Sequence, residues 1–140
     1  MHNSIEISIL IHATENKQKV LGALVGFLEL PQESIQIKSV KTEGHWRNPI
    51  DRLIISVNND VDRIFDRLCG RLSKTYDDHY VINYIKTNTD AKGHIYIRLD
   101  KQNLCNGEIM LSDKDSVRII FKKLGVFESR NKKNENDRNR

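Results

Sequence analysis

The sequence has little of what builds disulfide frameworks, metal centres or membrane spans. Its 140 residues include two cysteines and two prolines, and Cys69 and Cys105 form no Cys-x-x-Cys pair. No apolar run approaches the roughly 18 residues that a membrane-spanning helix requires, and the first residues do not follow the pattern of a signal peptide. We therefore expect two reduced thiols, no metal site, no membrane partner and a cytoplasmic protein.

Signatures of catalysis are missing from the sequence as well. There is no glycine-rich phosphate loop, no nucleophile elbow and no metal-ligand spacing. In a nuclease, Asp51, Asp78, His79 and Asp100 would have to converge in space on a magnesium ion. Surface charge and helix capping explain these residues more simply. We expect a protein that is not an enzyme and that uses no cofactor.

Charge is abundant but nearly balanced. Charged residues make up 30% of the sequence, and the formal net charge is +4. The segment 128–140 holds five basic and three acidic residues, which leaves 18 basic and 16 acidic residues of the 23 and 19 in the whole chain. A basic binding surface therefore has to come from how the charges are arranged. We expect one domain over 1–126 and a disordered charged tail over 127–140, because the tail offers almost no apolar residue to a core.

Hydrophobic periodicity divides the chain into strands and helices. The predicted strands are 5–11, 34–41, 53–57, 94–99, 109–111 and 117–124. The predicted helices are 15–29, a second that begins after Asp60, and a short third that includes 81–85. The order β-α-β-β-α-α-β-β-β, with short connections among the last strands, predicts an α+β fold of two layers: a mainly antiparallel sheet with helices on one face.

Local features refine the predicted helices. Thr14 offers an N-cap oxygen to the first helix. Gly22 and Gly26, four residues apart, predict that one face of that helix packs closely on the sheet. Asp77 and Asp78 fall in the first turn of the third helix, so we interpret them as capping residues.

The connection 43–50 carries more recognition chemistry than a turn requires. It contains the single tryptophan and crowds together four side chains that suit RNA, namely His45, Trp46, Arg47 and Asn48. Pro49 stiffens this connection, so the ring of Trp46 is able to stack on an unpaired base while Arg47 reaches a phosphate. The alternative is that Trp46 folds back as a lid over the edge of the core.

The second helix places arginines on one ridge. Arg63, Arg67 and Arg71 are four residues apart, and arginine forks match phosphate oxygens. The row is therefore a candidate phosphate-binding surface. The alternative is a solvated face, partly paired with Asp62 and Asp66.

Three segments stand out in this order and spacing: 9–15 (ILIHATE), 43–50 (EGHWRNPI) and 97–102 (IRLDKQ). Together they resemble an archaeal RNA-binding family often described as predicted exosome subunits, over about 6–124. The resemblance implies an α+β fold like that of the ribosomal protein that binds 5S rRNA, and a role in archaeal RNA metabolism without established catalytic residues.

Two functions compete on these grounds. In the first, the chain is a non-catalytic RNA-binding accessory protein in RNA processing or ribosome-related metabolism. Its contacts with structured or single-stranded RNA would come from the connection, from the arginine row, and from His12, Arg98, Lys101 and Gln102. In the second, the chain is a protein-interaction module that docks on exosome or ribosome components and touches RNA little. The near-neutral body favours the second function.

Overall fold

The computed structural model describes residues 2–43 and 48–123. The expected RNA contacts His45, Trp46 and Arg47 and the tail 127–140 lie outside the described residues. The elements in chain order are β1 (Ser4–His12), α1 (Lys17–Leu28), β2 (Ile35–Glu43), β3 (Pro49–Val57), α2 (Val61–Thr75), α3 (Asp78–Thr87), β4 (Ile95–Asp100), α4 (Lys101–Cys105) and β5 (Ser116–Lys122).

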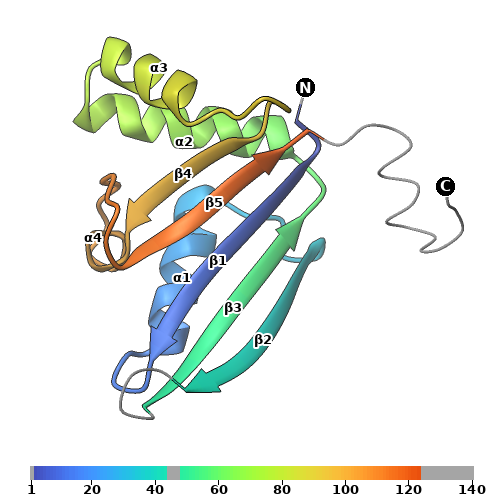
Figure 1. Ribbon diagram of the computed structural model, residues 1–140, viewed down its shortest axis with the longest axis vertical. Coiled ribbons are helices and arrows are strands. Elements are labelled where there is room, and N and C mark those ends of the chain that lie inside the picture. Colours follow the sequence, from blue (N-terminus) through green and yellow to red (C-terminus); the bar gives the residue numbers. More distant parts are fainter. Residues whose placement is uncertain (1, 44–47, 124–140) are drawn as a thin grey trace, which may run out of the picture.

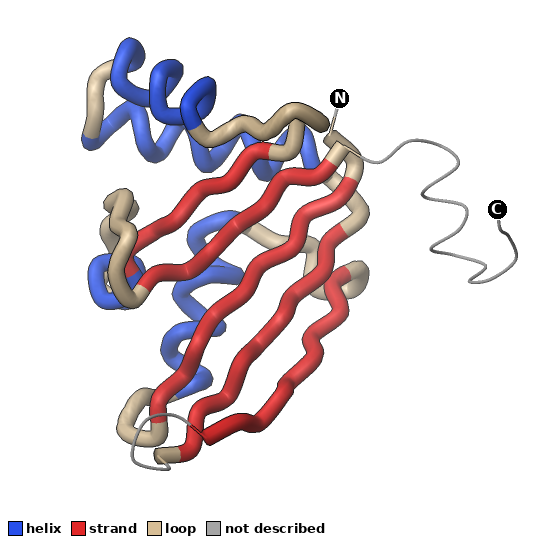
Figure 2. Tube along the Cα trace, in the orientation of Figure 1, coloured by secondary structure: helices blue, strands red, loops and turns tan. Residues whose placement is uncertain are grey.

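The five strands form one antiparallel sheet in the order β2-β3-β1-β5-β4. In Figures 1 and 2, α1 lies behind the sheet, while α2 and α3 lie across the end of the sheet beside β4. The opposite face of the sheet is left open in this view. The predicted α+β class, with an antiparallel sheet and helices on one face, is confirmed.

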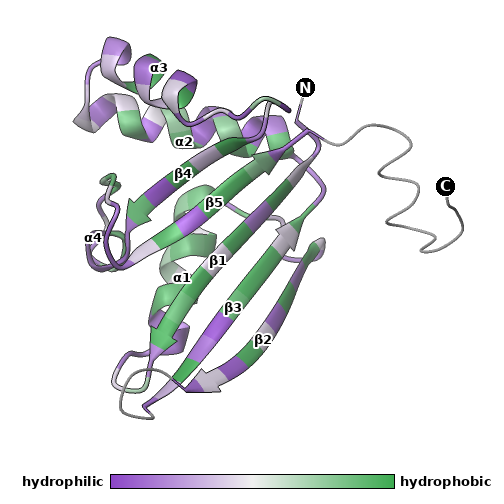
Figure 3. Cartoon of the chain, in the orientation of Figure 1, coloured by the Kyte–Doolittle hydropathy of each residue, from purple (hydrophilic) through white to green (hydrophobic). Residues whose placement is uncertain are grey.

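Alternation along the strands puts the core on the side of α1 and α2. In β1, Ile5, Ile7 and Ile9 are fully buried, and the residues between them are more exposed. The same alternation gives the strands their green and purple stripes in Figure 3. The apolar stripe of α2 completes this core, with Ile64, Leu68 and Leu72 fully buried.

Helix α1 starts later than Thr14, because Glu15 is used in a turn. The Glu15 N–H donates to the His12 carbonyl at 2.9 Å, and the Glu15 carboxylate accepts from the His12 N–H at 2.8 Å. Asn16 is therefore the N-cap and accepts from the Lys19 N–H. The expected sheet contact of Gly22 and Gly26 is wrong, since both are exposed and an added Cβ would meet nothing within 4 Å.

The last third contains a short helix that the sequence pattern did not predict. Asp100 ends β4 and caps α4, its carboxylate accepting from the Asn103 N–H at 2.8 Å. The run 109–111 that follows forms only an isolated bridge, between Leu111 and Leu99. The predicted capping by Asp77 is confirmed, because its carboxylate accepts from the Tyr80 N–H at 2.7 Å.

None of the helices in the described ranges is long and apolar enough to cross a membrane.

Candidate nucleic-acid interface

We call the sheet surface turned away from α1 the open face. The strand residues whose side chains belong to it alternate with the buried core residues. Five of them are basic and two are acidic; these are Lys38, Arg52, Arg98, Arg118 and Lys122, and Glu6 and Asp100. Both carboxylates are engaged, since Glu6 pairs with Lys122 at 2.6 Å and Asp100 caps α4. The open face therefore has an excess of positive charge within a body of nearly balanced charge.

Two arginines face each other across β4 and β5. Arg98 is the direct cross-strand partner of Arg118, and like charges in that position destabilise a sheet. The Arg98 guanidinium is 4.0 Å from the Asp113 carboxylate, with both side chains well exposed, so this pair offsets little of the repulsion. Across the part of the chain that the structure describes, Arg118 has no ion-pair partner. Such an arrangement is typical of a surface that binds a polyanion.

An aromatic ring adjoins this arginine pair. Tyr96 lies two residues before Arg98 on the same face of β4. Its hydroxyl donates to the Asp90 carboxylate at 3.0 Å, and this hydrogen bond raises the pKa of Tyr96. The bond also fixes the ring beside the arginines. A fixed, half-buried aromatic ring next to guanidinium groups is suited to stacking on an unpaired base.

The structure spreads the other sequence-predicted residues along the sheet. His12 ends β1 on the open face, and Asn48 is exposed immediately before β3, which is paired with β1 there. Arg98 lies two strands away and four residues further along, a separation of roughly 17 Å from strand spacing and rise. Gln102 is exposed on α4. These residues line a strip and do not form one cluster.

Lys101 lies inside the fold. Its side chain is 1% exposed, and its ammonium group donates to the Leu10 carbonyl at 2.7 Å, to Glu15 at 2.8 Å and to Asp115 at 2.9 Å. Burial alone would lower the pKa of Lys101, but the hydrogen bonds to both carboxylates outweigh it and raise the pKa. All three donors are used, so Lys101 ties the end of β1 to α4 and has no proton left for RNA.

The arginine row of α2 holds α1 in place; we call Arg63, Arg67 and Arg71 the arginine clamp. Arg67 donates to the Phe27 carbonyl at 2.8 Å, and Arg63 donates to the Glu29 carbonyl at 2.8 Å. These are carbonyls at the C-terminus of α1, where helices leave acceptors unsatisfied and favour positive charge. Both arginines also pair with the Glu29 carboxylate, and Arg71 lies 4.3 Å above the Phe27 ring.

The residues of the nuclease alternative are not brought together. Asp51 pairs with Lys41 at 2.8 Å and Lys17 at 3.8 Å, and the hydrogen bond from Lys41 lowers the pKa of Asp51. Asp78 lies in the first turn of α3, and Asp100 caps α4. Among the residues that the structure describes, no group of three or more His, Cys, Asp or Glu side chains is placed to hold a metal ion.

Sequence reasoning did not single out Arg118, Tyr96, Lys38 and Arg52, which the structure places on the open face. Strand alternation alone places Arg118 on one face of β5 and Ile119 and Phe121 on the other. This pattern could have identified Arg118 as a residue of the polar face. The pairing of Arg118 with Arg98 was not readable, because it depends on the register between β4 and β5, and α4 and a loop separate those strands.

The fold and this surface define a class: an α+β protein that presents a basic, open sheet face. Residues 4–123 match a family described as RNA binding. A protein of Pyrococcus abyssi named as RNA-binding is 33% identical over 132 residues, which cover 90% of this chain and 83% of that protein. An uncharacterized protein of Methanocaldococcus jannaschii is 32% identical over 139 residues, which cover 94% of this chain and 91% of that protein.

The fold recurs in a crystal structure from Sulfolobus solfataricus, with a TM-score of 0.71 at 20% identity over 94% of this chain and 96% of that one. The chain belongs to the RNA-binding family whose pattern it matches over 4–123. The resemblance to an archaeal RNA-binding family is thereby confirmed.

Proposed function

We propose that the chain is a non-catalytic accessory protein that binds single-stranded or looped RNA across the open face of its sheet. The observation that carries the proposal is the cross-strand pair of Arg98 and Arg118 beside Tyr96. A like-charge pair costs stability in the free protein. The cost is offset when a phosphate lies between the two guanidinium groups.

The shape of the surface favours unpaired RNA over a duplex. A sheet face offers side chains at regular intervals, about 4.8 Å across strands. Bases that are splayed out can stack on aromatic rings, whereas in an A-form helix they are already stacked. One row across the sheet contains Lys38, Arg118 and Arg98, so basic side chains stand at both edges of the open face.

Archaeal RNA processing or ribosome-related metabolism is the setting that we propose, with exosome or ribosome components as protein partners. Two things support this setting. The chain belongs to an RNA-binding family with archaeal relatives, and its segments 9–15, 43–50 and 97–102 resemble an archaeal family often described as predicted exosome subunits. His45, Trp46 and Arg47 in the connection 43–50, together with His12 and Asn48, would extend the RNA path beyond the end of β1.

The test is an electrophoretic mobility shift with single-stranded, hairpin and duplex RNA across a salt series. Arg118→Glu is expected to weaken binding of single-stranded RNA roughly tenfold or more, since it removes an attraction and adds a repulsion. Lys19→Glu is the matched control, because it makes the same change in net charge at an exposed position of α1. If both variants lose RNA affinity equally, the loss reflects net charge alone, and the proposal is contradicted.

A second candidate is the protein-interaction module, favoured by one observation. Strand β2 is an edge strand, and its apolar residues Ile37 and Val40 are 49% and 37% exposed. Edge strands of this kind can pair with a strand of another protein. If no RNA binds at moderate salt and the Arg118 and Lys19 variants behave like the unmodified protein, this candidate replaces RNA binding.

A further inference from the structure

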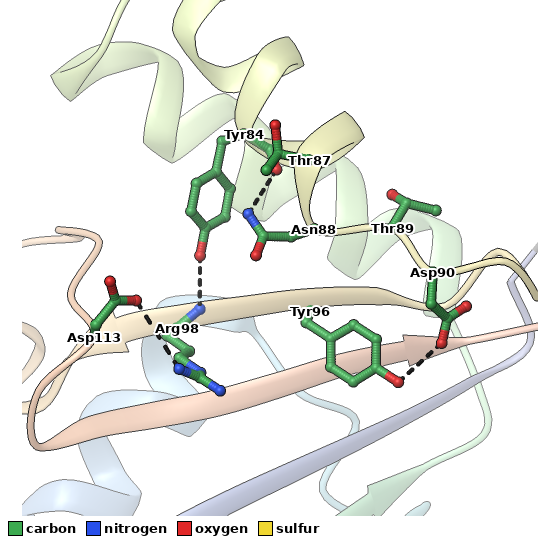
Figure 4. Close-up of a pocket in the computed structure, with 8 residues that line it drawn as sticks. All are labelled: Tyr84, Thr87, Asn88, Thr89, Asp90, Tyr96, Arg98 and Asp113. Carbon is green, nitrogen blue, oxygen red and sulfur yellow. Dashed lines mark hydrogen bonds and ion pairs between the residues drawn. The ribbon is translucent and has the colours of Figure 1, made fainter.

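A pocket of about 310 Å³ lies between the end of α3 and the outer edge of β4, next to the arginine pair (Figure 4). Tyr84 reaches down from α3, and Tyr96 and Arg98 come from β4. The volume falls at the lower end of the range for small-molecule sites, about 300–1,000 Å³. Of the residues that line it, only Arg98 belongs to one of the three segments that carry the family resemblance.

The pocket exists because the edge of β4 is covered at its ends and open in its middle. At one end the Tyr96 N–H donates to the Asn88 carbonyl at 2.9 Å. At the other end the Arg98 carbonyl accepts from the Ser112 N–H at 3.1 Å. Between them the Tyr84 hydroxyl accepts from the Arg98 N–H at 3.2 Å. A side chain thus takes the place of a neighbouring strand and leaves space beside it.

The pocket presents one donor and one acceptor that have no partner in the described ranges. The Tyr84 hydroxyl accepts from the backbone of Arg98, so its own proton is available to a ligand. A tyrosine hydroxyl keeps its proton at neutral pH, and burial raises the pKa of Tyr84 further. The Asn88 amide nitrogen donates to the Tyr84 carbonyl at 2.8 Å, which leaves the Asn88 side-chain oxygen as an acceptor.

The remaining lining supplies a flat ring and a cation. The Asp90 carboxylate holds the Tyr96 hydroxyl and also accepts from the Lys92 and His94 N–H groups at 2.9 Å, so the ring is anchored to a rigid turn. The guanidinium group of Arg98 stands at the other end of the pocket, near Asp113 (Figure 4). A donor, an acceptor, an aromatic ring and a cation complement one nucleotide: the edge of its base, the face of its base and its phosphate.

We infer that this pocket receives one unpaired nucleobase of the bound RNA, with the adjoining phosphate on Arg98. The inference rests on the proposed function and adds the place where one base is bound and recognised. All four bases carry a donor beside an acceptor on their Watson–Crick edge. The lining therefore defines a nucleobase site whose preference among the four bases is to be measured.

The first experiment uses mononucleotides, so it does not depend on RNA binding elsewhere. The four nucleoside 5′-monophosphates and ribose 5-phosphate are titrated separately into protein with labelled tyrosines, and the ring signals of Tyr84 and Tyr96 are followed by NMR. The nucleotides are expected to shift both rings, and ribose 5-phosphate is expected to shift neither. Rings that do not respond to any nucleotide at millimolar concentration overturn the inference.

The second experiment fills the pocket. Thr87 lines it at the end of α3, and Thr87→Trp is expected to abolish the tyrosine shifts and to weaken binding of a single-stranded oligoribonucleotide about fivefold or more. Ser73→Trp is the control, because Ser73 is an exposed helical hydroxyl residue that does not line the pocket. Tyr96→Leu is a second test variant, which removes the aromatic face while the pocket remains open.

The outcomes separate this inference from the proposed function. An oligoribonucleotide whose binding is lost in Arg118→Glu but unchanged in Thr87→Trp and Tyr96→Leu overturns the base pocket and leaves RNA binding on the open face. Mononucleotide shifts without any binding of oligoribonucleotides overturn both the RNA-binding function and the assignment of the base to an RNA strand.

Discussion

The charge reversal Arg118→Glu is expected to stabilise the fold while it weakens RNA binding. In the free protein Arg118 faces Arg98 directly across the two strands. A glutamate at this position would replace a repulsive pair by an attractive one. When a residue serves binding at the expense of stability, replacing it raises the stability of the free protein and lowers the affinity for RNA. The two changes have opposite signs because the stability cost is relieved only in the complex.

The expected gain follows from the surface position of the pair. An opposite-charge cross-strand pair contributes roughly 0.2–1 kcal/mol, and a like-charge pair is unfavourable. The reversal should therefore raise the free energy of unfolding by about 0.5–1.5 kcal/mol. For a domain of this size, 1 kcal/mol corresponds to roughly 2–5 °C in Tm. The gain should shrink as salt rises, since exposed charges are screened over about 10 Å at 0.1 M.

Calorimetry or circular dichroism at low and high salt measures the change in Tm. A double-mutant cycle with Arg98→Ala isolates the pair, because in that background the glutamate has no arginine opposite it and the gain should disappear.

Two results would refute the reasoning. A stability that falls or stays the same in Arg118→Glu would mean that the two guanidinium groups do not repel each other in solution. A gain in stability with undiminished RNA affinity would show that the arginine pair is not part of the RNA path.

Other predictions follow from the same contacts. Lys101→Met should lower the free energy of unfolding by about 3 kcal/mol in a urea titration, because it leaves the largely buried Glu15 carboxylate and the Leu10 carbonyl without their donor. Arg67→Ala should cost about 1–2 kcal/mol in the same titration and leave RNA affinity unchanged, as expected for part of the arginine clamp. Trp46→Ala should weaken binding of single-stranded or looped RNA roughly tenfold or more and change stability by less than about 1.5 kcal/mol. Gly22→Ala combined with Gly26→Ala should raise stability by about 1–2 kcal/mol, since both positions are open to solvent in α1.

The architecture was largely predictable because buried apolar residues recur at regular intervals along strands and helices. Isoleucines at every second position of β1 and leucines along α2 can be buried on one side only if they form a strand and a helix on a common core. Capping by Asp77 was equally readable, since it depends on neighbours within three residues. Helix α4 was not, because it has only five residues and begins at a capping aspartate that the pattern places at the end of a strand.

The site was less predictable because the role of a charged residue depends on tertiary neighbours. Arg67 and Arg98 look alike in sequence, each placed regularly on a polar face. In the structure Arg67 donates a hydrogen bond to the C-terminus of α1, whereas Arg98 lies on the open face opposite Arg118. Lys101 belongs to the segment 97–102 that carries the family resemblance, but its partners are distant in sequence: Glu15 precedes α1, and Asp115 directly precedes β5.

This sorting of charges bears on how tightly the protein can hold RNA alone. Lys101 and the arginine clamp are committed to the fold, whereas Lys38, Arg52 and Arg118 have no ion-pair partner in the described part of the chain. Together with Arg98 they allow about four phosphate contacts. For a single strand each contact contributes about 0.7 to the slope of log K against log salt, a total near −3, which is typical of modest affinity at physiological salt. A base in the pocket beside β4 would add to this. Docking on a larger RNA-processing assembly would add more, because it raises the effective concentration of the open face at the RNA without requiring a more basic surface.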